Sequence, residues 1–160
     1  DYNRVVRDLN GLGRETLLAR IGGNFEVEPV ADGRPRAAAT FGMYLDHRWY
    51  RLRAKAGSYP ASDPVRSLDV AILQDNLLGP VLGIGDPRSD ERIDFVGGIR
   101  GRAELERLVD SGRWAVAVAM HPTSIAQLFA VADAGLVMPP KSTWFEPKLR
   151  SGLLVRPLDD

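Results

Sequence analysis

Groups that bind anions gather in the segment 139–152. Three cations stand against one acid in this segment, and two hydroxyl groups directly follow the first cation. Ammonium, guanidinium and hydroxyl donors on a backbone stiffened by three prolines are suited to hold a phosphate or a carboxylate. We therefore predict an anion or nucleotide-phosphate site, whose ligand-binding residues are Lys141, Ser142, Thr143, Lys148 and Arg150.

The same segment also has a purely structural interpretation. Trp144 and Phe145 would be costly to leave in water, so their rings could anchor the segment in the core while the cations stay solvated. The triplet Lys141-Ser142-Thr143 is not a phosphate-binding P-loop, because the glycines that should precede it are absent. The ligand site and the core plug both remain open at this point.

A second candidate group follows a buried strand and precedes a helix. Helix N-termini attract anions, so His121, Thr123 and Ser124 could form one wall of a pocket, with segment 139–152 as the other wall. A histidine there could act as acid, base or donor, and His121 is the candidate catalytic residue. The alternative is that Thr123 or Ser124 only caps the helix while His121 bonds a neighbour. His47, at a predicted hairpin turn, is expected to be structural.

A basic strand surface supports a third hypothesis. Its cations and rings resemble a platform that stacks the bases of single-stranded nucleic acid. The formal net charge of zero argues against such a partner and favours a solvated outer face. The residues of this surface are Trp49, Arg51, Arg53 and Lys55, with Tyr44 across the hairpin.

The sequence indicates no metal ion and no resident cofactor. The chain has no Cys, which excludes a thiolate nucleophile, a disulfide framework and Cys-ligated zinc. Its aspartates are scattered without a regular ligand spacing, so no metal site is predicted. A nucleotide is the one cofactor-like ligand that the anion site would accept.

Hydrophobic periodicity predicts the elements that must position these groups. Several strands follow one another directly and others follow a helix, which favours α+β over a doubly wound parallel sheet. We expect a two-layer fold with a mixed, largely antiparallel sheet of about six to seven strands and about four helices. The expected strands are 2–9, 25–29, 40–47, 49–55, 92–96, 114–120 and 153–158, and the helices lie near 17–21, 67–78, 105–111 and 124–132.

Composition indicates a globular chain. Its 160 residues, 44% of them hydrophobic and 26% charged, exclude a disordered chain and predict a single domain over residues 1–160. The longest apolar run, Trp114 to Met120, is too short for a membrane span, which needs about 20 residues. Because no leader is present, we expect a cytoplasmic chain with no membrane partner. The start at Asp1 suggests a piece cut from a longer protein.

Four motifs together carry a family resemblance. The most specific is Pro-Pro-Lys-Ser-Thr-Trp-Phe-Glu-Pro-Lys over 139–148. The others are His121-Pro122-Thr123-Ser124, Val131-Ala132-Asp133-Ala134-Gly135 and Tyr2-Asn3-Arg4-Val5-Val6. With these motifs the chain resembles the C-terminal half of the bacterial and archaeal family known as domain of unknown function 1015.

The resemblance implies a partner and, by analogy, a kind of chemistry. Family members are typically more than twice this length, so the missing N-terminal half of the same polypeptide is the expected partner. That half carries a His-His-Arg stretch similar to one in the ParB and sulfiredoxin superfamily, which includes nucleotide-dependent free-serine kinases. Phosphoryl transfer is thus implied only by analogy, because fold likeness does not fix function. The stretch is absent here, and the family has no settled activity.

Three functional hypotheses follow. The first is a soluble domain that binds an anionic or nucleotide-phosphate ligand, as part of an active site shared with the N-terminal half. The second is an interaction module whose proline-rich segment packs against that half. The third is nucleic-acid binding through the basic strand. For the isolated chain we expect little or no turnover, and whether the whole protein is an enzyme stays open.

Overall fold

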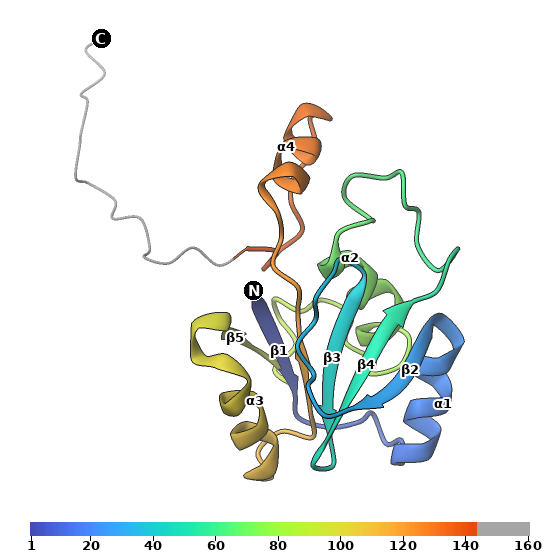
Figure 1. The fold of residues 1–160 in the computed structure, drawn as a ribbon, viewed down its shortest axis with the longest axis vertical. Helices are drawn as coiled ribbons and strands as arrows, with labels where there is room; N and C mark the ends of the chain where they lie inside the picture. The colour runs from blue at the N-terminus through green and yellow to red at the C-terminus, as the bar shows by residue number, and fades with distance from the viewer. Residues whose placement is uncertain (144–160) are drawn as a thin grey trace, which may run out of the picture.

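The computed structural model describes residues 1–143, and the organisation in this range is one six-stranded sheet with helices packed against it (Figure 1). The strands are β1 (Tyr2–Val6), β2 (Phe25–Val30), β3 (Thr40–Leu45), β4 (Arg48–Ala54), β5 (Ile93–Gly97) and β6 (Val116–Ala119). The helices are α1 (Arg14–Asn24), α2 (Asp69–Leu73), the π-helix η1 (Gln74–Leu78), the 3-10 turn η2 (Gly98–Arg100), α3 (Gly101–Asp110) and α4 (Ile125–Asp133).

The strand order is β2-β4-β3-β6-β1-β5, and each of the five pairings is antiparallel. The predicted α+β class, largely antiparallel sheet, strand number and four α-helices are confirmed. The strand β6 lies between β3 and β1 with every residue buried, as its apolar run predicts for a central strand. The predicted strand at 153–158 lies outside the described residues.

The core has one part on each face of the sheet, because successive strand residues point to opposite faces. Val6 packs in a cluster with Leu17 and Ile21 of α1 and with the buried residues of α2 and η1. Its neighbour Val5 packs in a second cluster with Leu105 and Val109 of α3. Helices therefore cover both faces of the sheet. The predicted two-layer arrangement is wrong in this respect, because α3 adds a third layer on the face opposite α1 and α2.

The hairpin between β3 and β4 turns on two residues with positive φ. Asp46 has φ 49° and His47 has φ 57°, the conformation of a type I′ turn, whose twist matches that of the flanking strands. His47 Nδ1 lies 2.9 Å from Asp110 Oδ1, and the same carboxylate accepts a hydrogen bond from the Tyr44 hydroxyl at 3.1 Å. These contacts fasten the turn to the end of α3, which agrees with a structural role for His47.

Two predicted helix starts differ in outcome. Ser124 forms the predicted capping box, since its hydroxyl accepts from the Gln127 N–H at 3.1 Å and the Gln127 side chain accepts from the Ser124 N–H at 2.9 Å. Ser67 does not cap the second helix. The N-cap there is Leu68, without a side-chain bond, because the chain from Asp63 to Ser67 already forms a turn closed by a backbone bond of 3.0 Å.

Candidate functional site

A large cavity lies on the α3 face of the sheet, beside the end of β6. It has a volume of about 770 Å³, and three arginines, Asp32 and His121 line it. We call it the arginine cavity and define it by Arg34, Arg36, Arg102 and His121. Its size lies in the range of pockets that hold small molecules.

Close backbone contacts place two of these arginines. The loop after β2 crosses the sheet so closely that a Cβ on Gly42 would collide with the carbonyl oxygen of Gly33. A Cβ on Gly33 would in turn collide with the ring of Trp49. Only glycine permits this approach at both positions, so Gly33 and Gly42 fix the backbone directly before Arg34, and the side chains of Arg34 and Arg36 extend from it as exposed groups.

Asp32 is shared between two arginines of the cavity. Its carboxylate lies 3.7 Å from Arg36 Nη2 and forms an ion pair with Arg102 of α3. Among the described residues, no carboxylate lies within ion-pair distance of Arg34. Near Asp32, the three arginines therefore outnumber the carboxylate with which they could pair. This excess of positive charge favours an anionic ligand.

His121 reaches the arginine cavity because the chain leaves β6 at a fixed point. The buried Asn3 side chain accepts a hydrogen bond from the Met120 N–H at 2.9 Å, directly before His121. Asp69, which is 6% exposed, lies close enough for the charge of His121 to act on it. Burial raises the pKa of Asp69 to about 6, and the Ala39 N–H bond and His121 both oppose this shift. A histidine and a buried carboxylate thus lie near each other at the cavity.

The predicted helix start and proline-rich segment do lie side by side. Thr123 Oγ1 donates to the Ser142 carbonyl at 2.9 Å, and Ser142 Oγ donates to the carbonyl of Pro139. Together with Ser124 and Thr143, these residues line a small hollow of about 130 Å³. The hydroxyl groups of Thr123 and Ser142 both donate to backbone carbonyls. Their main role in the structure is therefore to hold the helix start and the proline-rich segment together.

Lys141 is not among the residues that line the arginine cavity with His121. The Lys141 ammonium group lies 5.3 Å from the centre of the Phe95 ring, and the Lys141 carbonyl accepts from Arg4 Nη2 at 2.8 Å. The predicted site residues Lys148 and Arg150, and the proposed anchors Trp144 and Phe145, lie outside the described residues. Whether the segment binds anions stays a prediction.

The basic strand offers no exposed ring for a base. Trp49 is 6% exposed and donates to Glu106 Oε1 at 2.7 Å, and Tyr44 is equally buried against Trp49. Arg51 pairs with Glu28 and Arg53 with Glu26 across the β2–β4 pairing. This surface is a solvated sheet face whose arginines are paired.

The arginines of the cavity and Arg4 were missed at the level of sequence. Arg34 and Arg36 stand in the polar stretch 31–36, which has no period and looks like an ordinary loop. A recognisable signal was the pair Arg34-Pro35-Arg36, in which proline stiffens the spacing between two cations. Arg4 stands within a short apolar strand, where a charged residue is unusual.

Residues 1–71 match the model of a family described as "Protein of unknown function (DUF1015)". Over these residues the chain is similar to that family. No curated protein and no solved structure matches the chain.

This match to the DUF1015 model supports the predicted family identity but does not confirm the predicted position within that family. The match covers the N-terminal part of this chain, and it does not test whether the chain is a C-terminal half. Within residues 1–143, no group of three side chains is arranged to hold a metal ion. None of the helices described in this range has the length and apolar character that crossing a bilayer requires.

Proposed function

We propose that this chain binds a small phosphorylated anion, such as a nucleotide, in the arginine cavity. The observation that carries the proposal is the convergence of Arg34, Arg36 and Arg102 with His121 on one hollow of about 770 Å³. Guanidinium groups bind phosphate oxygens in bidentate fashion, and several of them around one hollow balance a multiply charged group.

A neighbouring hollow extends the positive wall. It has a volume of about 370 Å³, shares Asp32, Arg34 and Arg36 with the arginine cavity, and adds Arg51 and Arg53. A ligand longer than phosphate would follow this wall, with its phosphates at Arg34 and Arg36.

In a longer polypeptide, the same cavity would be one wall of an active site shared with the N-terminal half. His121 would donate or accept a proton there, and the arginines would stabilise charge on a transferring phosphoryl group. The proposed reaction is phosphoryl transfer, and its proposed location is the cytoplasm.

Melting temperatures with ATP, ADP and phosphate test the proposal. A ligand at about 100 times its Kd adds about 2.7 kcal/mol, which raises the Tm of a chain of this size by roughly 5–10 °C. We expect the Arg102→Ala variant to lose this rise and the Arg20→Ala variant, altered at an exposed residue of α1, to keep it.

Two outcomes would contradict the proposal. One is an unchanged Tm with all three ligands, and the other is an equal rise in the Arg102→Ala variant. A rise that disappears in Lys141→Ala but persists in Arg102→Ala would move the site to the proline-rich segment.

The second candidate function is an interaction module, and the surface of α4 favours it. Ile125, Phe129, Leu136 and Val137 are all about half exposed or more, and Val131 is the one buried residue of the helix. Figure 1 shows α4 standing away from the sheet. Since exposed apolar patches mark contact sites, we propose that the N-terminal half covers this surface.

Hydrogen exchange of a longer polypeptide that includes the N-terminal half tests this second function. The α4 amides should exchange at least tenfold more slowly there than in the 160-residue chain. Equal exchange in the two proteins would exclude α4 as the interface.

A further inference from the structure

A second cavity lies on the opposite face of the sheet from the arginine cavity. Asn3 lines the arginine cavity, and the next residue of β1, Arg4, lines a hollow of about 540 Å³ against α2 and η1. Adjacent strand residues point to opposite faces, so the two hollows are separated by the sheet. We call the second hollow the Arg4 cavity.

Arg4 is a buried cation without a carboxylate partner among the described residues. It is 4% exposed, and its guanidinium group donates to the carbonyl oxygens of Tyr2 and Lys141. Its Cζ lies 5.2 Å from the centre of the Phe95 ring and 5.6 Å from that of Tyr2. Burial lowers the pKa of Arg4 to about 10, which still leaves it charged at neutral pH. Carbonyls and rings orient this charge, but they do not neutralise it.

The other two arginines of the Arg4 cavity are already paired. Arg88 lies 2.7 Å from Asp86, and Arg66 lies 3.6 Å from Asp75. Those two carboxylates would repel a ligand with several negative charges. The side-chain charges of this cavity therefore suit a ligand with one negative charge, whereas those of the arginine cavity suit a ligand with more than one.

The remaining walls are apolar and held in place. Val70, Ala71 and Leu78 form one side, and Pro139 and Pro140 of the proline-rich segment form another. Gln74 of the π-helix lines the cavity and donates to the Ile84 carbonyl at 2.7 Å. π-helical turns often occur at functional sites.

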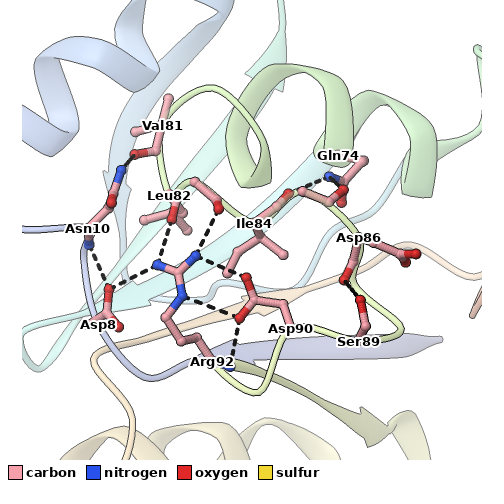
Figure 2. A network of polar contacts seen from close by, with 12 residues as sticks. Asp8, Asn10, Gln74, Val81, Leu82, Ile84, Asp86, Ser89, Asp90 and Arg92 are labelled. Atoms are coloured by element: carbon pink, nitrogen blue, oxygen red, sulfur yellow. Dashed lines mark hydrogen bonds and ion pairs between the residues drawn. The ribbon is translucent and has the colours of Figure 1, made fainter.

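Residues 85–88 form a wall of the Arg4 cavity, and hydrogen bonds of the segments before and after them hold this wall in place. Figure 2 shows the Arg92 guanidinium group bonded to the carbonyl of Leu82 and to the carboxylates of Asp8 and Asp90. The same group donates to the Gly83 carbonyl at 2.8 Å. Asn10 adds a bond to the Val81 carbonyl at 3.2 Å. The cavity is thus largely formed before any ligand arrives, which lowers the entropic cost of binding.

We propose that the Arg4 cavity binds a small monocarboxylate with an apolar body, such as an aryl or branched-chain acid. The carboxylate of the ligand pairs with Arg4, and its apolar part lies between α2, η1 and the two prolines. Carboxylate and guanidinium form the bidentate pair that Arg4 lacks among the described residues. This site is independent of the proposed anion site.

The test is a pair of NMR titrations of the 160-residue chain, one with phenylacetate and one with phenylacetamide, its uncharged analogue of nearly the same shape. We expect phenylacetate to shift the amides of Ala71, Gln74 and Gly85 saturably, with a Kd of about 1 mM or lower. Phenylacetamide should bind at least about tenfold more weakly, because it cannot pair with the buried cation.

Two variants locate the site. Ala71→Leu fills the hollow and should abolish the saturable shifts, while Ala103→Leu, on an exposed position of α3, should leave them unchanged. Arg4→Gln should weaken binding about tenfold or more. If Arg4→Gln does not fold, the comparison of acid with amide and the Ala71→Leu variant still decide. Equal affinity for acid and amide, binding that survives in Ala71→Leu, or no saturable shift with phenylacetate would overturn the proposal.

Discussion

Single buried charges are the most informative residues of this chain. Arg4 and Asp69 are both at most 6% exposed, and the charged form of each is disfavoured by burial. A fold keeps such groups only where other contacts offset the cost. Arg4 is held by carbonyls and rings, whereas Asp69 Oδ2 has no hydrogen-bond partner among the described residues.

The stability of the chain should depend on pH through Asp69. Its folded-state pKa of about 6 lies above the usual value, so the folded state binds the proton more tightly than the unfolded state does. Stability is therefore greatest below the unfolded-state pKa and falls as the pH rises to the folded-state value. We expect Asp69→Asn, which keeps an acceptor for the Ala39 N–H, to remove a decrease on the order of 2 kcal/mol between about pH 4 and pH 7.

Urea denaturation at several pH values checks this prediction. Asp133→Asn, altered at an exposed residue at the end of α4, is the matched control and should keep the pH dependence of the parent chain. A parent and an Asp69→Asn variant with parallel pH profiles would show that the buried carboxylate does not control stability.

At the scale of elements, one close crossing forms the arginine cavity. The contact of Gly33 with Gly42 and Trp49 holds the loop after β2 against the sheet. A methyl group at Gly42 would meet a backbone carbonyl, which cannot move aside as a side chain can.

We expect Gly42→Ala to lower the free energy of unfolding by about 2 kcal/mol or more and to weaken binding of ADP. Gly22→Ala is the control, because a Cβ at Gly22 meets nothing within 4 Å. Urea denaturation and calorimetric titration measure the two effects. Loss of stability with unchanged ADP binding would show that the loop does not form the site.

The capping box makes α4 a helix in spite of its few contacts with the body of the chain. Ser124→Ala removes one of the two reciprocal bonds and should cost about 1 kcal/mol of local stability. Amides of α4 should then exchange about fivefold faster, while those of β6 stay as they are. Exchange at an unchanged rate would mean that α4 is held by something other than its cap.

Helices and strands that bury one or both faces could be predicted from the sequence. The tertiary contacts between these elements could not. The apolar run at 114–120 indicates a central strand, and β6 is one. The Ser124 and Gln127 spacing indicates a capping box, which forms as expected. In contrast, the crossing of Gly33 over Gly42 could not be predicted. This contact depends on tertiary packing, and the residues around the two glycines show no pattern that indicates it.

The candidate site illustrates the same limit. The segments of Lys141 and His121 are in contact, as their motifs suggest. His121 lines the arginine cavity, however, whereas the Lys141 ammonium group lies over the Phe95 ring. The cavity that a side chain reaches depends on the contacts that fix the backbone next to it. For His121, this contact is the bond from the Met120 N–H to the Asn3 side chain. Such long-range bonds leave no trace in a local pattern.

At the scale of the whole molecule, the sheet separates two cavities of different charge. Three arginines, Asp1 and Asp32 line the arginine cavity, whereas the Arg4 cavity contains one buried cation that has no carboxylate partner within residues 1–143. We expect the two sites to bind independently, since they share no lining residue. Phenylacetate should therefore change the Kd for ADP by less than about twofold, as calorimetric titration in its presence would show. A larger change would mean that the sheet couples the sites.

The most direct test of the central claim is a crystal structure of the 160-residue chain with ADP. We predict that phosphate density lies between Arg34, Arg102 and His121. Phosphate density against Lys141, Ser142 and Thr143, with the arginine cavity empty, would contradict the account.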